Sequence, residues 1–181
     1  MKFTETTLQG VFVIELEKRG DDRGFFARLF CEREFAQHGL NPKIVQMNNS
    51  SSGQRGTLRG IHYQLAPKAE DKTFRCISGA LFDVVIDLRP NSPTFLKHVA
   101  VELTGENRKM IHVPQGCANS FMTLADNTEI FYFTSEFYAP ELERGIRYND
   151  PALSIQWPMA PTVISDKDKN HSDFKPETHL K

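Results

Sequence analysis

Short apolar runs, separated by glycine, proline and polar turn residues, recur along most of the chain. From Leu58 onwards the pattern is almost entirely one of short strands with turns between them. The expected strands are 11–16, 25–30, 44–48, 58–64, 73–78, 80–88, 97–103, 109–113 and 129–134. Strands at such regular spacing predict a mainly β protein, built as a sandwich or a barrel.

One of these runs, 80–88, is apolar on both faces and is interrupted only by Asp83 and Asp87. A carboxylate within an apolar strand requires a partner, because burial of an unpaired charge is costly. Asp83 is therefore expected to have a partner.

The segments between the runs predict few helices. Residues 19–24 have turn chemistry, and 49–56 form a polar loop. Residues 32–38 resemble a short helix, which Gly39 is placed to end. After Pro158 the composition becomes polar, and 169–181 are expected to form a loosely held tail. Residues 1–181 are predicted to be a single domain, since this length suits one sizeable core.

Composition and charge exclude several classes of protein. The formal net charge is −1, so no overall basic field attracts nucleic acid or an anionic membrane. No apolar run approaches the roughly 20 residues that span a bilayer, and the N-terminus lacks the apolar region of a secretory signal. Cys31, Cys76 and Cys117 are an odd number without metal-ligand spacing. We expect buried thiols and a cytoplasmic protein.

The segment Leu58-Arg59-Gly60-Ile61-His62-Tyr63-Gln64 carries the most chemistry. Strand alternation places His62 and Gln64 on one face and Arg59, Ile61 and Tyr63 on the other. A lone histidine on an apolar strand is usually structural. Here Arg59 and Lys72 are cationic neighbours that would suit an anionic ligand, which favours His62 as a working base.

Several motifs in order resemble one family. They are Arg59-Gly60-Ile61-His62-Tyr63-Gln64, Phe82-Asp83-Val84-Val85-Ile86-Asp87, Ser92-Pro93-Thr94-Phe95, Tyr138-Ala139-Pro140-Glu141 and Ser165…Lys167-Asp168. This order is similar to that of the dTDP-4-dehydrorhamnose 3,5-epimerases, and the resemblance runs from about residue 10 to residue 168.

The resemblance implies a cupin-type jelly-roll barrel, a homodimer with sites shared across the interface, and no cofactor. It also implies no metal. The residues agree on this last point, because metal-binding cupins use a His-x-His pair and here Tyr63 and Gln64 follow His62.

The implied reaction is epimerisation at carbon 3, carbon 5 or both of a nucleotide-linked 4-keto-6-deoxyhexose. Such chemistry requires a base, a proton donor on the opposite face of the sugar and a group that stabilises the enolate oxygen. By resemblance His62 is the base, Asp168 orients it, Tyr132 is the donor and Lys72 stabilises the oxyanion. The substrate-binding residues implied in the same way are Arg23, Arg28, Gln46, Asn48, Arg59, Asn119 and Tyr138, with Arg23 acting across the dimer interface.

Some positions depart from the family pattern. Asn119 stands where the family usually has histidine, and Phe133 where lysine is common. Asparagine does not carry a proton at neutral pH, so the enzyme would act at only one carbon if that histidine aids proton transfer. Arg28 replaces a glutamate near the base of the nucleotide, and Arg19 replaces an aromatic residue. An arginine only donates hydrogen bonds, which suits the ring nitrogen of cytosine better than the N–H of thymine.

Alternatives to the double epimerase therefore stay open. One is a single-position epimerase, or one that acts on a CDP-linked sugar. A related ketoisomerase fits less well, because the segment around Tyr132 and Tyr138 follows the epimerase pattern. A non-catalytic cupin that binds sugar nucleotides is the non-enzyme alternative, and a metal-dependent cupin enzyme is the most distant one.

Overall fold

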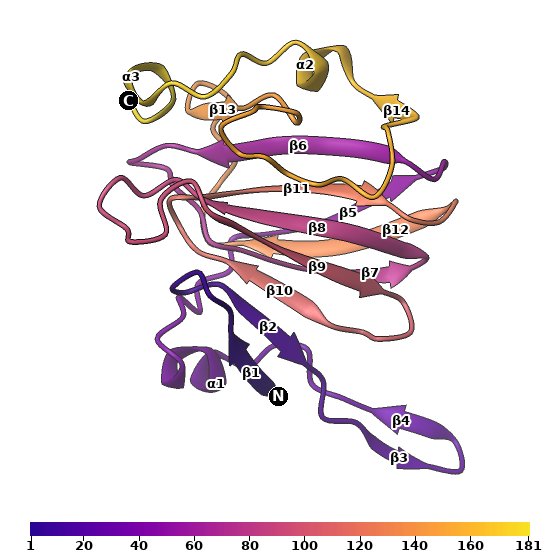
Figure 1. Ribbon diagram of the computed structural model, residues 1–181. Coiled ribbons are helices and arrows are strands. Elements are labelled where there is room, and N and C mark those ends of the chain that lie inside the picture. The colour runs from indigo at the N-terminus through magenta and orange to yellow at the C-terminus, as the bar shows by residue number, and fades with distance from the viewer.

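The computed structural model describes residues 1–181 and has two large β-sheets that face each other as a jelly-roll barrel (Figure 1). One sheet has the strand order β1-β2-β10-β7-β12-β5. Its strands are β1 (Lys2–Glu5), β2 (Phe12–Glu15), β10 (Met110–Val113), β7 (Lys72–Ser78), β12 (Thr128–Thr134) and β5 (Gln46–Ser52). The mainly β, cupin-type fold is thus confirmed.

The second sheet has the order β13-β6-β11-β8-β9, and β14 pairs with β6 in parallel. Its strands are β13 (Glu143–Gly145), β6 (Thr57–Gln64), β11 (Cys117–Thr123), β8 (Ala80–Asp87), β9 (His98–Thr104) and β14 (Val163–Ile164). Outside the barrel lie the hairpin β3 (Arg19–Asp21) and β4 (Gly24–Phe26), and the helices α1 (Glu32–Gln37), α2 (Asp166–Lys169) and α3 (Pro176–His179). No helix is long and apolar enough to cross a membrane.

Strand β8 explains why its sequence is apolar on both faces. Leu81 and Val85 belong to the core between the two sheets, whereas Val84 and Ile86 pack on the outer face of their sheet. Asp83 has the parity of Leu81 and Val85, so its side chain enters the barrel and is completely buried. Both faces are covered, and both are therefore apolar.

The C-terminal segment is what covers that outer face. Phe174 and Leu180 pack against a buried cluster that includes Ile61 and Ile86, and the Tyr63 hydroxyl donates a 2.8 Å hydrogen bond to the carbonyl of His179. The prediction of a loosely held tail over 169–181 is therefore wrong. This segment has so few apolar residues that its average composition is polar. Nevertheless, Phe174 and Leu180 both pack on the outer face of the sheet.

Other elements differ from the predictions in ways that burial explains. Residues 49–52 are not loop but the second half of β5, which pairs with β12 along its whole length. This strand lies at the edge of its sheet and alternates between exposed and part-buried positions, so it is polar. The strand expected over 25–30 ends at Phe26, because β4 is only the second half of a short hairpin. The helix and its end at Gly39, which has a φ of +72°, are confirmed.

A buried histidine on β10, in the same sheet as β5, makes the folding stability depend on pH. His112 is 2 % exposed and its Nδ1 lies 2.8 Å from the Thr73 hydroxyl. Burial lowers the pKa of His112 from 6.5 to about 4, although Asp71 opposes this shift. Since the unfolded chain takes up this proton first, folded stability should fall as the pH drops from about 6.5 to about 4, by roughly 2–3 kcal/mol.

We expect His112→Gln to remove most of this loss. Urea unfolding of both proteins at pH 7.5 and pH 4.5 measures it as a difference of differences, which cancels the titration of other groups. An unchanged pH dependence in the variant would contradict the prediction.

Candidate active site

A cavity of about 500 Å³ lies inside the barrel, below α2 and β14. Its polar lining comes from strands of both sheets and from α2, and it includes Arg59, His62, Lys72, Asn119, Tyr132 and Asp168. An adjoining cavity of about 360 Å³ shares His62, Lys72 and Tyr132 with the first and adds Gln46, Asn48 and Tyr138. The barrel thus gathers nine of the eleven residues that the sequence proposed for the site.

His62 and Asp168 form a hydrogen-bonded pair at the wall of the cavity. His62 Nε2 lies 2.7 Å from Asp168 Oδ1, and the Gly60 N–H donates to Asp168 Oδ2 at 3.2 Å. Burial raises the pKa of Asp168, but the contacts with His62 and Gly60 outweigh it and leave this pKa below its usual range. The carboxylate is therefore ionised and accepts the proton of Nε2, so Nδ1 is the ring nitrogen with a free lone pair.

Asp168 reaches this position because of a local cap. The N-cap of the four-residue helix α2 is Ser165, whose hydroxyl accepts a hydrogen bond from the Asp168 N–H at 3.1 Å. The same segment joins the barrel through β14, which pairs with the start of β6. Residues 106 positions apart in sequence thereby meet.

Lys72 lines the same cavity as the pair, from strand β7 of the other sheet. Its Nζ lies 5.9 Å from the centre of the Tyr132 ring, 3.0 Å from Glu70 Oε1 and 3.5 Å from Asn119 Oδ1. The side chain is 20 % exposed, so it is held at the wall and does not extend into solvent. An ammonium in this position can stabilise negative charge that develops on a ligand in the cavity.

Asp83 lies behind Asn119 in the barrel interior. Neither of its carboxyl oxygens has a hydrogen-bond partner. Burial raises the pKa of Asp83 well above its usual value, and the nearby Asn119 amide and Lys72 ammonium only partly oppose this. Burial thus favours the protonated form of Asp83, and the Asn119 amide approaches the carboxyl group without forming a hydrogen bond of good geometry.

Arg59 lines the same cavity as His62, which strand alternation did not predict. The register between β6 and β11 shifts next to it, between Asn119 and Phe121. Gly60 occupies the irregularity with a φ of +101°, and a Cβ there would lie 2.8 Å from the Asn119 carbonyl. The irregularity turns Arg59 towards the cavity, where its Nε and Nη2 bond to Ser52 and Ser51.

The second cavity contains a carboxylate that the sequence did not single out. Glu143 accepts a 3.0 Å hydrogen bond from the Tyr138 hydroxyl and is paired with Lys167. Burial raises the pKa of Glu143, but the contacts with Lys167 and Tyr138 outweigh this effect. The pKa is therefore below its usual value, and Glu143 is ionised. The adjacent Tyr138-Ala139-Pro140 motif was the only sequence signal for it. Gln46 Oε1 accepts the Tyr138 backbone N–H at 2.9 Å and so fixes this segment.

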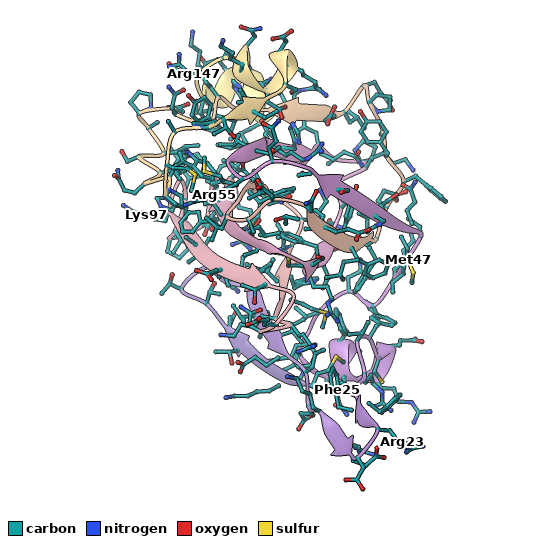
Figure 2. All side chains as sticks on the ribbon, turned by 90° about the vertical axis from the view of Figure 1, so that its right-hand side faces the viewer. Arg23, Phe25, Met47, Arg55, Lys97 and Arg147 are labelled. Atoms are coloured by element: carbon teal, nitrogen blue, oxygen red, sulfur yellow. The ribbon has the colours of Figure 1, made fainter.

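Arg23 and Arg28 do not reach the cavity of their own chain. Figure 2 shows Arg23 and Phe25 on the hairpin that projects from the end of the molecule opposite α2. The Arg23 side chain is 89 % exposed and pairs with Asp21. Arg28 pairs with Glu34 at 2.8 Å and lines a separate cavity of about 290 Å³ with Glu17, Arg19 and Phe26.

A second histidine, His171, lies next to the His62–Asp168 pair. His171 Nε2 lies 3.7 Å from Asp168 Oδ1, and the two imidazole rings are 6.1 Å apart in an edge-to-face arrangement. Sequence reasoning missed His171, because it lies in the segment expected to be a loose tail. His62, Asp168 and His171 together could hold a metal ion, which the spacing along β6 alone did not indicate.

Comparisons with known proteins identify the family of this chain. The sequence model of the family described as dTDP-4-dehydrorhamnose 3,5-epimerase matches residues 5–176. The dTDP-4-dehydrorhamnose 3,5-epimerase of Shigella flexneri is 41 % identical over 96 % of both chains.

Solved structures agree in fold and sequence. The crystal structure of dTDP-4-dehydrorhamnose 3,5-epimerase from Elizabethkingia anophelis covers 99 % of both chains with a TM-score of 0.95 and 36 % identity. ChmJ, a 3'-monoepimerase from Streptomyces bikiniensis solved with dTDP-quinovose, covers 93 % of this chain and 85 % of its own, with a TM-score of 0.86 and 33 % identity. On its sequence and its fold, this chain belongs to the dTDP-4-dehydrorhamnose 3,5-epimerase family.

Proposed function

We propose that this protein epimerises a dTDP-linked 4-keto-6-deoxyhexose, with His62 as the base and Tyr132 as the acid. The observation that carries the proposal is the His62–Asp168 hydrogen bond at the wall of a cavity that also presents Lys72 and Tyr132. These groups are the ones that deprotonation next to a ketone requires.

The reaction follows from the position of each group. The ketone at carbon 4 acidifies the C–H bonds at carbons 3 and 5. His62 Nδ1 takes one of these protons, and the ionised Asp168 stabilises the imidazolium that forms. Lys72 stabilises the enolate oxygen, and Tyr132 returns a proton to the opposite face of the carbon, which inverts it. No electron leaves the substrate, so the reaction as proposed uses no redox cofactor.

The diphosphate requires cations at the mouth of the cavity. Arg59 uses Nε and Nη2 within the protein, which leaves Nη1 to bind a phosphate oxygen. Arg23 is the second candidate, and it can reach a cavity only in another copy of the chain. We therefore propose a homodimer in which the β3–β4 hairpin completes the partner's site.

Mixing two inactive variants tests this sharing of sites. In a heterodimer of Arg23→Ala and His62→Asn subunits, one site has both substitutions and the other has neither. We expect activity to return when the two variants are co-refolded, whereas two Arg23→Ala subunits stay impaired. If the mixture is no more active than its components, Arg23 does not act across an interface.

The nucleotide is proposed to be dTDP. Arg28 by itself favoured cytosine, but its guanidinium is already paired, and Glu17 and Glu34 line the same small cavity. A carboxylate that accepts the N–H of thymine is therefore present near Arg28. The bound dTDP-quinovose of ChmJ supports the same nucleotide class.

Proton NMR in heavy water tests the activity and the nucleotide together. The substrate is 4-keto-6-deoxyglucose linked to dTDP or, separately, to CDP. We expect loss of the signals at carbons 3 and 5 of the dTDP sugar and slower loss with CDP. Faster reaction of the CDP sugar would reverse the nucleotide assignment. A folded protein that binds dTDP but leaves every carbon-bound proton in place would be a binding cupin and not an enzyme.

A single-position epimerase is the second candidate, because Asn119 cannot relay a proton and Asp83 behind it lacks a partner. If Asn119 narrows the reaction, one carbon of the dTDP sugar will exchange much faster than the other. Asn119→His would pair with Asp83, and we expect it to speed exchange at the slower carbon by about tenfold or more. Asn119→Gln is the control, since it keeps an amide. Comparable exchange at both carbons in the unmodified protein would contradict the proposal that Asn119 restricts the reaction to one carbon.

A further inference from the structure

Three side chains that meet behind the cavity have the composition of a metal site. His62 Nε2, His171 Nε2 and Asp168 Oδ1 all lie within 4.8 Å of one another. Asp168 Oδ1 is the shared centre, at 2.7 Å from His62 Nε2 and 3.7 Å from His171 Nε2. The three residues come from β6, from α2 and from the segment that follows α2.

His171 is unusual because its Nε2 atom is buried and forms no hydrogen bond. The side chain is 18 % exposed, and Nε2 is buried with no hydrogen-bond partner. The ring lies against Gly145 so closely that a Cβ there would be 2.1 Å from Nε2. The chain thus has a glycine where the ring of His171 needs the space, and Nε2 of that ring lies 3.7 Å from Asp168 Oδ1. An unpartnered imidazole nitrogen next to a carboxylate is costly unless something binds between them.

The geometry points to an inhibitory site for a zinc-class divalent cation, held by His62, Asp168 and His171. Two imidazole nitrogens and one carboxylate oxygen are an established ligand set for zinc. With zinc–ligand distances of about 2.0–2.1 Å, tetrahedral ligand atoms lie about 3.3 Å apart. The 2.7 Å contact has to open by about 0.6 Å and the 3.7 Å contact to close by about 0.4 Å. The two Nε2 atoms, which lie within 4.8 Å of each other, have to reach the same separation. A water molecule from the cavity takes the fourth position.

The groups around the three ligands favour metal binding, because they orient the carboxylate and leave no unpaired lysine beside it. Asp168 Oδ2 is held by the Gly60 N–H, which orients the carboxylate and leaves Oδ1 for the ion. The nearest lysine, Lys167, is neutralised by its pairing with Glu143. The bound cation therefore adds charge next to one ionised carboxylate and not next to a free ammonium.

Binding would stop catalysis through the proton on His62. In the free protein Nε2 carries the proton that is donated to Asp168, and Nδ1 is free. The ion coordinates through the Nε2 lone pair, so the proton of neutral His62 moves from Nε2 to Nδ1 and none is lost. A ring that is protonated on Nδ1 and metallated on Nε2 has no lone pair left to accept the substrate's proton. This consequence rests on the proposed role of His62, whereas the binding does not.

Cobalt(II) and zinc(II) are the probes. Their binding is measured without substrate, because a diphosphate would itself bind either ion, and in the exchange assay Zn²⁺ is supplied in excess over the diphosphate sugar. We expect Co²⁺ to give the visible absorption of a tetrahedral site, and calorimetry to show one Zn²⁺ per chain. In the exchange assay Zn²⁺ should lower kcat, and a chelator should restore it. His171→Gln should keep the basal activity unchanged but bind Zn²⁺ at least about tenfold more weakly. His98→Gln, on β9, is the matched control.

Several outcomes would overturn the site. They are the absence of a tetrahedral cobalt spectrum, a thiolate charge-transfer band that places the ion at Cys31, or unchanged zinc affinity in His171→Gln. If that variant does not fold, Gly145→Ala serves instead, because it keeps all three ligands but displaces the His171 ring. Zinc that binds without inhibiting would leave the site standing and count against His62 as the base. An active enzyme that binds no zinc would refute only the site.

Discussion

Replacing His62 with asparagine is expected to lower kcat for solvent exchange and epimerisation by about 10³-fold, within the range of general-base removals. Asparagine is smaller than histidine, and its amide ends at the position of the ring atoms next to Cγ, so it does not reach Asp168 Oδ1 as His62 Nε2 does. The Asp168 carboxylate keeps its contact with the Gly60 N–H. Asparagine offers no basic nitrogen to the cavity. The loss should therefore appear in the rate of proton abstraction and not in the binding of substrate.

The measurement is proton NMR of the dTDP sugar in heavy water, followed at carbons 3 and 5. Binding of dTDP and the melting temperature, both expected to stay unchanged, show that the variant is folded. His98→Asn, outside the cavity, is the matched substitution. Exchange in His62→Asn at a rate near that of the unmodified protein would remove His62 from the role of base.

Replacing Tyr132 with phenylalanine should separate two steps that normally occur together. His62 remains, so protons should still wash out into heavy water. Return of a proton from the opposite face requires the phenol, so formation of the inverted product should fall by about 10²-fold or more. The ratio of washed-out to inverted substrate, which the same spectra provide, is the diagnostic quantity.

The substitution changes little else in the structure. The Tyr132 ring packs against the main core and lies 5.9 Å from Lys72 Nζ, and phenylalanine preserves both contacts. Its hydroxyl donates no hydrogen bond within the protein, so folding stability should not change. Tyr148→Phe is the control for loss of a phenol elsewhere. Equal loss of wash-out and inversion in Tyr132→Phe would mean that the phenol acts before proton return.

Some elements of the fold could be predicted because their burial is uniform. The run 80–88 is apolar throughout, and β8 is covered on both faces. Other elements could not be predicted, because their surroundings depend on distant residues. Strand β11 combines Asn119 and Ser120 with buried neighbours, and no period stands out. Strand β5 is serine- and asparagine-rich because it is an edge, and the sequence does not state which strand will be the edge.

The residues of the candidate site also divide into those that the sequence predicted and those that only the structure revealed. His62, Lys72, Tyr132 and Asp168 were identified through their motifs, and the barrel brings them to one cavity. The placement of Arg59 was predicted on the wrong face, since the irregularity at Gly60 is a property of the pairing between β6 and β11. Glu143 and His171 were missed, because each matters only through residues far away in the chain.

By itself the sequence determined the mainly β class, the family and the residue types that a keto-sugar epimerase needs, because these depend on local periodicity and on motifs that are contiguous in the chain. Only the tertiary structure decided that the last segment covers the outer face of the sheet, that Asp83 is buried without a partner, and that His171 stands beside Asp168. The reason is physical. Burial, pKa and ligand geometry depend on distances between atoms, and residues more than a hundred positions apart become neighbours only when the barrel closes.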